Sequence, residues 1–157
     1  MFSPPISCRF ALLLLALGSI VACAESALPL VEVYKNPYCG CCDGWSAHLE
    51  KAGFPVTVYV VEDTDATRQQ LGMPVAYASC HTAKISGDKP YLLEGHVPVE
   101  DIKRLLKEAP DALGIAVPGM PLGSPGMEVP KEHEQPYETL LILPDGSSRV
   151  YAQHGPR

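Results

Sequence analysis

The chain has 157 residues, of which 46% are hydrophobic, and its 12 basic and 18 acidic side chains leave a formal net charge of −6. This acidity argues against a nucleic-acid-binding protein, because phosphate backbones are bound by a basic face. Without a leader, the remaining length is that of one small domain.

The first residues predict a secretory signal peptide. Arg9 precedes an apolar run over residues 10–17, and small residues follow, which is the order of the charged, apolar and cleavage regions of such a signal. The apolar run is too short for a transmembrane helix, which needs about 20 residues. We therefore expect export from the cytoplasm of a bacterium.

Two cleavage sites fit this leader. Residues 22–24 read Ala-Cys-Ala, which predicts a signal over residues 1–24 and Glu25 as the first mature residue. Residues 20–23 instead resemble the lipobox of bacterial lipoproteins, which predicts a signal over residues 1–22 and a lipid anchor on Cys23. Both forms are expected to reach the periplasm.

The mature chain begins with strand and helix patterns in alternation. Alternating or β-branched runs predict the strands. Apolar residues at helical spacing predict the helices, and a glycine directly after each helical segment predicts where that helix ends. The second strand is expected to be buried, because it is a continuous β-branched run. In chain order these elements are a strand over 28–34, a helix over 43–52, a strand over 56–61 and a helix over 63–71.

A hairpin and a third helix follow. Two strand-like runs, 80–85 and 91–95, flank a Ser-Gly-Asp turn at 86–88, which predicts a β-hairpin. The third helix is expected after Pro98, because apolar residues recur there on one helical face. That face consists of Ile102, Leu105, Leu106 and Ala109.

Composition changes near residue 116. Prolines and glycines crowd residues 116–136, which excludes a long helix or a central strand there. The runs 137–143 and 149–151 then predict a second hairpin that extends the sheet.

The predicted fold class is α/β, with a thioredoxin-like sheet flanked by helices, a Pro/Gly-rich loop and a C-terminal β-hairpin extension. The order β-α-β-α-β-β-α is compatible with such a sheet, in which a CxxC motif begins the first helix. We assign residues 28–115 to the core and residues 116–157 to the loop and hairpin of the same domain. Cys80, at the entry to the third strand, is then expected near the start of the first helix.

Three thiols, those of Cys39, Cys41 and Cys42, lie where the first helix is expected to begin. A helix N-terminus stabilises thiolates, and thiolates are soft ligands that select Cu(I), Zn(II) or iron-sulfur clusters. Structural disulfides are the ordinary interpretation of cysteines in an exported protein, but three clustered cysteines and one distant Cys80 allow at most one long-range bridge. The cluster therefore predicts a metal or redox site.

Four motifs together resemble the CopG-like bacterial copper-resistance proteins. They are Cys39-Gly-Cys-Cys42, Ser79-Cys-His-Thr-Ala83, Glu94-Gly-His-Val-Pro98 and the Gly-Met-Pro segment from Gly119 to Glu128. The resemblance implies a thioredoxin-like fold, a periplasmic location alongside other copper-handling proteins, and a suggested role in copper redox interconversion. It also implies that copper is held by Cys39, Cys41, Cys42 and Cys80.

The chemistry of the residues agrees with that implication. Thiolates bridge two or more Cu(I) ions, whereas one Zn(II) takes four terminal ligands in a tetrahedron, and neighbouring Cys41 and Cys42 suit bridging better than chelation. Additional ligands are conceivable among soft thioethers and imidazoles: Met120, Met127, His81 and His96. Of these, His81 is expected to face away from Cys80, because neighbouring strand residues alternate. The family match brings His96 into consideration.

The sequence thus predicts a periplasmic copper-binding protein with a Cu(I)-thiolate cluster and a copper redox or electron-transfer activity. Two alternatives stay open: a thiol-disulfide oxidoreductase that uses Cys39 and Cys42, and a [2Fe-2S] carrier. We also expect the rigid loop from Gly119 to Glu128 to fold back over the thiols, because its glycines allow close backbone approach.

Overall fold

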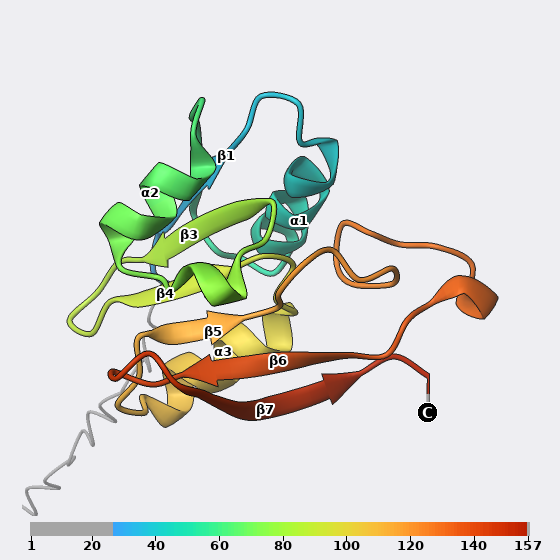
Figure 1. Cartoon of the computed structure of the whole chain (residues 1–157). Helices are drawn as coiled ribbons and strands as arrows, with labels where there is room; N and C mark the ends of the chain where they lie inside the picture. The colour runs from blue at the N-terminus through green and yellow to red at the C-terminus, as the bar shows by residue number, and fades with distance from the viewer. Residues whose placement is uncertain (1–26, 157) are drawn as a thin grey trace, which may run out of the picture.

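The computed structural model describes residues 27–156, which form a seven-stranded mixed sheet flanked by three helices (Figure 1). The predicted leader and Cys23 lie outside these residues. Within them, no helix is long and apolar enough to cross a membrane. The elements are β1 (Val31–Lys35), α1 (Gly40–Lys51), β2 (Val56–Val60), α2 (Thr64–Leu71), η1 (Val75–Tyr77), β3 (His81–Ile85), β4 (Tyr91–Glu94), α3 (Val99–Glu108), β5 (Gly114–Ala116), η2 (Lys131–His133), β6 (Tyr137–Ile142) and β7 (Ser148–His154).

The strands lie in the order β2-β1-β3-β4-β5-β6-β7. The pairs β1 with β2 and β4 with β5 are parallel, and the other pairs are antiparallel. This confirms the α/β fold class, both hairpins and the extension of the sheet by the second hairpin. That the sheet is thioredoxin-like in its details stays a prediction.

The side chains of neighbouring strand residues pack into two separate hydrophobic cores, because side chains alternate between the faces of a sheet. Leu93 packs with the helices α1 and α3 on one face, whereas Leu92 packs with Met73, next to α2, on the other. The larger core contains Trp45 and Leu49 of α1 and Ile102 and Leu105 of α3. The first helix is thereby fixed against the sheet by the face that the sequence predicted.

The helix ends follow the local sequence signals. The side chain of Asp63 accepts a hydrogen bond from the backbone N–H of Ala66 at 2.8 Å, which caps α2, and Gly72 ends that helix with φ at +93°. Helix α3 starts directly after Pro98, as predicted. Helix α1 starts at Gly40, three residues before the predicted start, so Cys41 and Cys42 lie in its first turn.

The prediction that the second strand is buried is wrong. Strand β2 is an edge strand that pairs only with β1, and Val58, Tyr59 and Val60 are 40%, 42% and 62% exposed. A β-branched run indicates a strand but does not say whether a neighbour covers it, because that depends on the order of strands in the sheet.

Strand β5 was not predicted. It has only three residues, Gly114–Ala116, and yet it lies in the middle of the sheet between β4 and β6. Its glycine has a steric reason: a Cβ added at Gly114 would lie 1.8 Å from the carbonyl oxygen of Leu92 in β4. The two backbones therefore approach too closely for any side chain at this position.

The variant Gly114→Ala should be destabilised by about 2 kcal/mol or more, because the sheet must open to admit the methyl group. Gly40→Ala is the matched control, because a Cβ added there meets nothing within 4 Å. Urea unfolding of both variants measures the difference. Equal stability of the two variants would contradict the close contact between β4 and β5.

Candidate metal centre

The four cysteines among residues 27–156 converge where strand β1 ends and strand β3 begins. Strands β1 and β3 are antiparallel, with Lys35 opposite His81, so the residues after β1 and the residue before β3 lie side by side. Cys39, Cys41 and Cys42 follow β1, and Cys80 precedes β3. The four sulfurs all lie within 4.8 Å of one another, which confirms that Cys80 lies near the start of the first helix.

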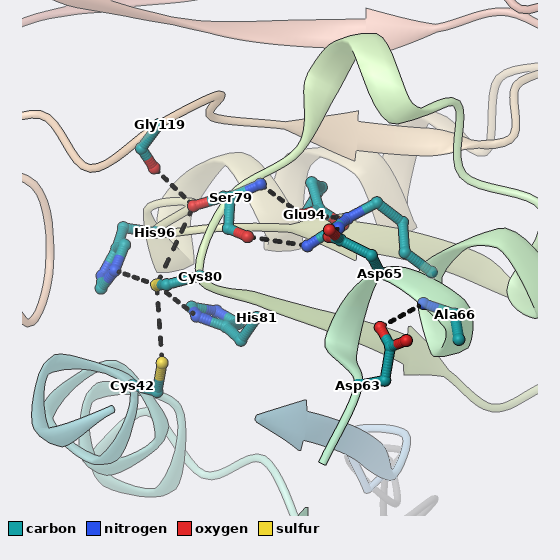
Figure 2. A network of polar contacts seen from close by, with 11 residues as sticks. Cys42, Asp63, Asp65, Ala66, Ser79, Cys80, His81, Glu94, His96 and Gly119 are labelled. Atoms are coloured by element: carbon teal, nitrogen blue, oxygen red, sulfur yellow. Dashed lines mark hydrogen bonds and ion pairs between the residues drawn. The ribbon is translucent and has the colours of Figure 1, made fainter. Parts of the chain in front are cut away.

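Two of these sulfurs are joined. Cys39 and Cys42 form a disulfide, whereas Cys41 and Cys80 are free thiols. The Cys42 sulfur lies 3.5 Å from that of Cys80, and the Cys39 sulfur lies 3.5 Å from that of Cys41 (Figure 2 shows the first pair). Since metal ligation needs thiolates, the full set of four sulfur ligands exists only after this disulfide is reduced.

A buried ion pair holds the backbone immediately before Cys80. Arg68 and Glu94 are both 0% exposed, and Arg68 Nε donates to Glu94 Oε1 at 2.8 Å. The backbone N–H of Ser79 donates to the same carboxylate oxygen at 2.7 Å, and Arg68 Nη2 donates to the Ser79 carbonyl at 2.7 Å (Figure 2). Burial raises the pKa of the Glu94 carboxyl, and Arg68 opposes that shift. No sequence signal indicated this pair, because an arginine on a short polar helix is ordinarily a surface residue.

Both histidines beside the thiols are buried against Cys80. His96 Nε2 lies 3.0 Å and His81 Nδ1 lies 3.4 Å from the Cys80 sulfur (Figure 2). The expectation that His81 faces away from Cys80 is therefore wrong: its ring lies against the ring of Trp45, with centroids 4.4 Å apart, and this turns Nδ1 toward the sulfur. Cys80, His81 and His96 form a second group of donors whose atoms lie within 4.8 Å of one another.

The contact of His96 with the backbone of Pro125 shows which of its two ring nitrogens carries the proton. His96 Nδ1 lies 2.8 Å from the carbonyl oxygen of Pro125, and only a nitrogen that carries a proton can donate to a carbonyl. In the neutral ring, Nε2 therefore has its lone pair free and directed at Cys80. This is the arrangement in which protein histidines bind metals, with the second nitrogen held by a carbonyl or carboxylate.

Burial controls the charges of these groups. Burial, together with the nearby Cys41 thiol, raises the pKa of the Cys80 thiol to about 12. Burial lowers the pKa of His81 to about 3, with His96, Arg68 and Lys35 adding to the shift, and it also lowers the pKa of His96. Both imidazoles are therefore neutral near pH 7, which is the form that ligates metals.

A buried lysine holds the turn that carries Cys39. Lys35, the last residue of β1, donates from Nζ to the Cys39 carbonyl at 3.1 Å and pairs with Asp43 at 2.6 Å. Its ammonium group thereby fixes the segment between β1 and α1 and places a positive charge close to the thiols.

The Pro/Gly-rich loop contacts the start of α1. A Cβ added at Gly126 would lie 2.5 Å from the Cys41 carbonyl and 2.7 Å from the Trp45 amide nitrogen, so the two backbones touch. Two residues further on, Glu128 Oε1 lies 2.6 Å from Nε2 of His48 in α1. This end of the loop thus packs on the helix turn that carries the cysteines.

The methionines of this loop differ in exposure. Met120 is 52% exposed, and Met127 is partly buried. Ligation of a metal by either thioether stays a prediction, as does ligation by the cysteines and histidines.

Residues 77–127 match a family described as a protein of unknown function, DUF411. Two solved structures, described as copper resistance protein CopG in form 1 and form 2, are similar to the chain. They are 40% and 41% identical to it, cover 82% and 81% of it, and are themselves covered to 99% and 98%. The TM-score is 0.74 for both. No curated protein matches the chain significantly.

The variant Gly126→Ala should displace the loop from α1. Gly119→Ala is the matched control, because both glycines have positive φ (+86° and +71°) but a Cβ at Gly119 meets nothing within 4 Å. Both variants place alanine at a positive φ, which glycine adopts more easily, but only Gly126→Ala also adds a steric clash. Gly126→Ala should therefore be less stable than Gly119→Ala by about 1 to 3 kcal/mol. It should also speed alkylation of Cys80, measured by mass spectrometry. Equal behaviour of the two variants would show that the loop is not seated on the helix.

The low pKa of His81 predicts acid sensitivity. In the unfolded chain His81 binds a proton below about pH 6.5, whereas the folded chain excludes it down to about pH 3. The unfolded state then binds more protons in this window, so stability falls as the pH falls, by at most about 1.4 kcal/mol per pH unit. His81→Gln should flatten the pH dependence of the unfolding free energy of the metal-free protein. His48→Gln, a change at a half-exposed histidine, should flatten it less, and an equal effect of the two changes would contradict the assignment.

Proposed function

Because this chain belongs to the family of the copper resistance protein CopG, we propose that it is an exported copper-binding protein in which Cys39, Cys41, Cys42 and Cys80 hold Cu(I). One observation carries the proposal: these four sulfurs, from two distant parts of the chain, all lie within 4.8 Å of one another. Four sulfurs so close together are a donor set for a soft metal ion.

The donors fit a copper-thiolate cluster better than a single zinc ion. Cys41 and Cys42 are neighbours in the first turn of α1, so their side chains leave the helix in different directions and suit the bridging of several ions. The neutral His96 and His81 add nitrogen donors next to Cys80. Copper accepts both thiolate and imidazole donors, and these four sulfurs and two imidazoles exceed the four ligands that complete a structural zinc site.

Other residues of the chain would support the cluster without touching copper. The pair of Arg68 and Glu94 fixes the backbone before Cys80, and Lys35 fixes the carbonyl of Cys39. The Pro125 carbonyl holds His96 in the form that has Nε2 free. Such fixed partners keep ligands in place before the metal arrives, which lowers the cost of binding.

We extend the proposal to the location of the protein, to its redox role and to the loop beside the cysteines. The leader supports export to the periplasm, either as a soluble protein or anchored through Cys23, where other copper-handling proteins would be the partners. Several Cu(I) ions bridged by thiolates can give up electrons, which supports a role in the interconversion of Cu(I) and Cu(II). The contact of Gly126 with α1 supports a shielding role for the loop from Gly119 to Glu128.

A second function has one observation in its favour. The disulfide between Cys39 and Cys42 is the oxidised form of a CxxC motif at a helix start, as thiol-disulfide oxidoreductases have. Such an enzyme needs an attacking thiol and a resolving thiol, and it has no need of Cys41. No comparable observation favours a [2Fe-2S] carrier.

Copper titration tests the principal proposal. The anaerobically reduced protein should bind more than one Cu(I) per chain, and the variant with all four cysteines changed to serine should bind none. The double variant Cys8→Ser, Cys23→Ser is the matched control and should keep full binding. A limit of one copper or less per chain would overturn the cluster, and retained binding in the quadruple variant would overturn the ligands.

The single variant Cys41→Ser separates the two functions. A bridged cluster loses copper with this change, whereas a dithiol oxidoreductase keeps its insulin-reducing activity. Strong insulin reduction by Cys41→Ser together with unchanged copper binding would favour the oxidoreductase.

A further inference from the structure

We propose that Cys42 is the shared sulfur of two interchangeable disulfides, so that the Cys39–Cys42 bond passes to Cys42–Cys80 within one chain. Cys80 is then the internal resolving thiol of this protein. The exchange needs no metal and goes beyond the copper binding proposed above.

The positions of three sulfurs carry the inference. Cys42 is already bonded to Cys39, and the free thiol of Cys80 lies only 3.5 Å away from the Cys42 sulfur. A disulfide is opened by a thiol that reaches one of its two sulfurs, and the attacking sulfur displaces the other. Cys80 is therefore placed to displace Cys39.

Burial decides which thiol can make this attack. Cys42 is 0% exposed, so a thiol from another molecule cannot reach its sulfur, whereas Cys39 is partly exposed next to Tyr38, which is 93% exposed. A thiol of another molecule thus reaches the Cys39 sulfur, whereas only a thiol of the same chain reaches the Cys42 sulfur. Cys80, in contact with Cys42, is the free thiol in the described part of the chain that is suited to the inner role.

The step balances in atoms and electrons. The Cys80 sulfur gives up its proton and bonds to the Cys42 sulfur as the Cys39–Cys42 bond breaks, and Cys39 leaves as a thiolate that takes up a proton. One S–S bond replaces another, and no oxidant or reductant is needed. His96 Nε2 lies 3.0 Å from the Cys80 sulfur with its lone pair free, so it accepts a hydrogen bond from the Cys80 thiol before the exchange.

The movement required is small. The Cys80 sulfur must approach that of Cys42 from 3.5 Å to the bond length of about 2.05 Å and must move into line with the Cys39–Cys42 bond, changes that rotation about the side-chain bonds can supply. The backbone before Cys80 stays fixed, because Arg68 and Glu94 hold Ser79 on both of its polar groups. The exchange is thus a local rearrangement at the start of α1.

The exchange changes which thiols face outward. With Cys39–Cys42 closed, the free thiols are Cys41 and Cys80. With Cys42–Cys80 closed, Cys39 and Cys41 would be free together at the helix start; their sulfurs lie 3.5 Å apart in the form with Cys39–Cys42 closed. A disulfide that forms at Cys39 is thereby moved inward, and an outer pair of thiols is restored.

Disulfide mapping of the metal-free full chain tests the proposal. The protein is treated with a copper chelator, oxidised to one disulfide per chain with limiting diamide, quenched in acid, alkylated, digested with trypsin and analysed by mass spectrometry. Cleavage after Lys35, Lys51, Arg68 and Lys84 places Cys39, Cys41 and Cys42 in one peptide, 36–51, and Cys80 in another, 69–84. A Cys42–Cys80 bond joins these two peptides, and a Cys39–Cys42 bond does not.

The wild-type protein should give both the joined and the unjoined form. In Cys39→Ser the joined pair should become the main disulfide and rise several-fold, because the competing partner is gone. Cys41→Ser is the matched control and should behave like the wild type, whereas Cys42→Ser should give no joined pair.

Absence of the joined pair from both the wild type and Cys39→Ser would overturn the proposal, as would an undiminished joined pair in Cys42→Ser. Circular dichroism shows whether each variant is folded, and the wild-type result decides if Cys39→Ser is not. Because copper is absent throughout, a negative result leaves the copper proposal standing, and a failed copper titration leaves this one standing.

Discussion

The antiparallel pairing of β1 with β3 is the constraint on which the site depends. It sets Lys35 opposite His81, and so the turn that leaves β1 and the segment that enters β3 must meet. Helix α1 then starts at this same end of the strands β1 and β3. It is held in place by Trp45 and Leu49, which are buried in the main core. The cysteines meet because the sheet brings together two parts of the chain some forty residues apart.

The site is surrounded by buried polar groups that a core built for stability alone would avoid. Arg68 and Glu94 are fully buried, and one carboxylate oxygen of Glu94 and Nε2 of His81 have no hydrogen-bond partner among residues 27–156. Burial of charged and unpaired polar groups costs free energy, and natural proteins tolerate that cost chiefly at functional sites. Here the pair fixes Ser79, and thereby the position of Cys80.

The proposed copper binding and the proposed disulfide exchange draw on the same sulfurs. A disulfide between Cys39 and Cys42 removes two thiolates from the donor set, so the two chemistries exclude each other at any one moment. The redox state of the compartment then decides how many sulfurs a metal ion can find. Burial of Cys80 adds to this control, because it raises the pKa of the free thiol and keeps it protonated until a metal ion takes the place of its proton.

The sequence by itself determined the local elements and the kind of chemistry. Cysteine spacing, glycine stops and alternating patterns act over a few residues, and so they predicted the helices and both hairpins. The convergence of Cys80 with the first helix was predicted from the order of these elements, which is compatible with a thioredoxin-like sheet. The tertiary structure decided what depends on neighbours distant in sequence. It made β2 an exposed edge, inserted β5 where only Gly114 fits, turned His81 toward Cys80 by packing its ring against Trp45, and buried Arg68 against Glu94. Burial and side-chain direction arise from packing between distant segments, and no local pattern encodes them.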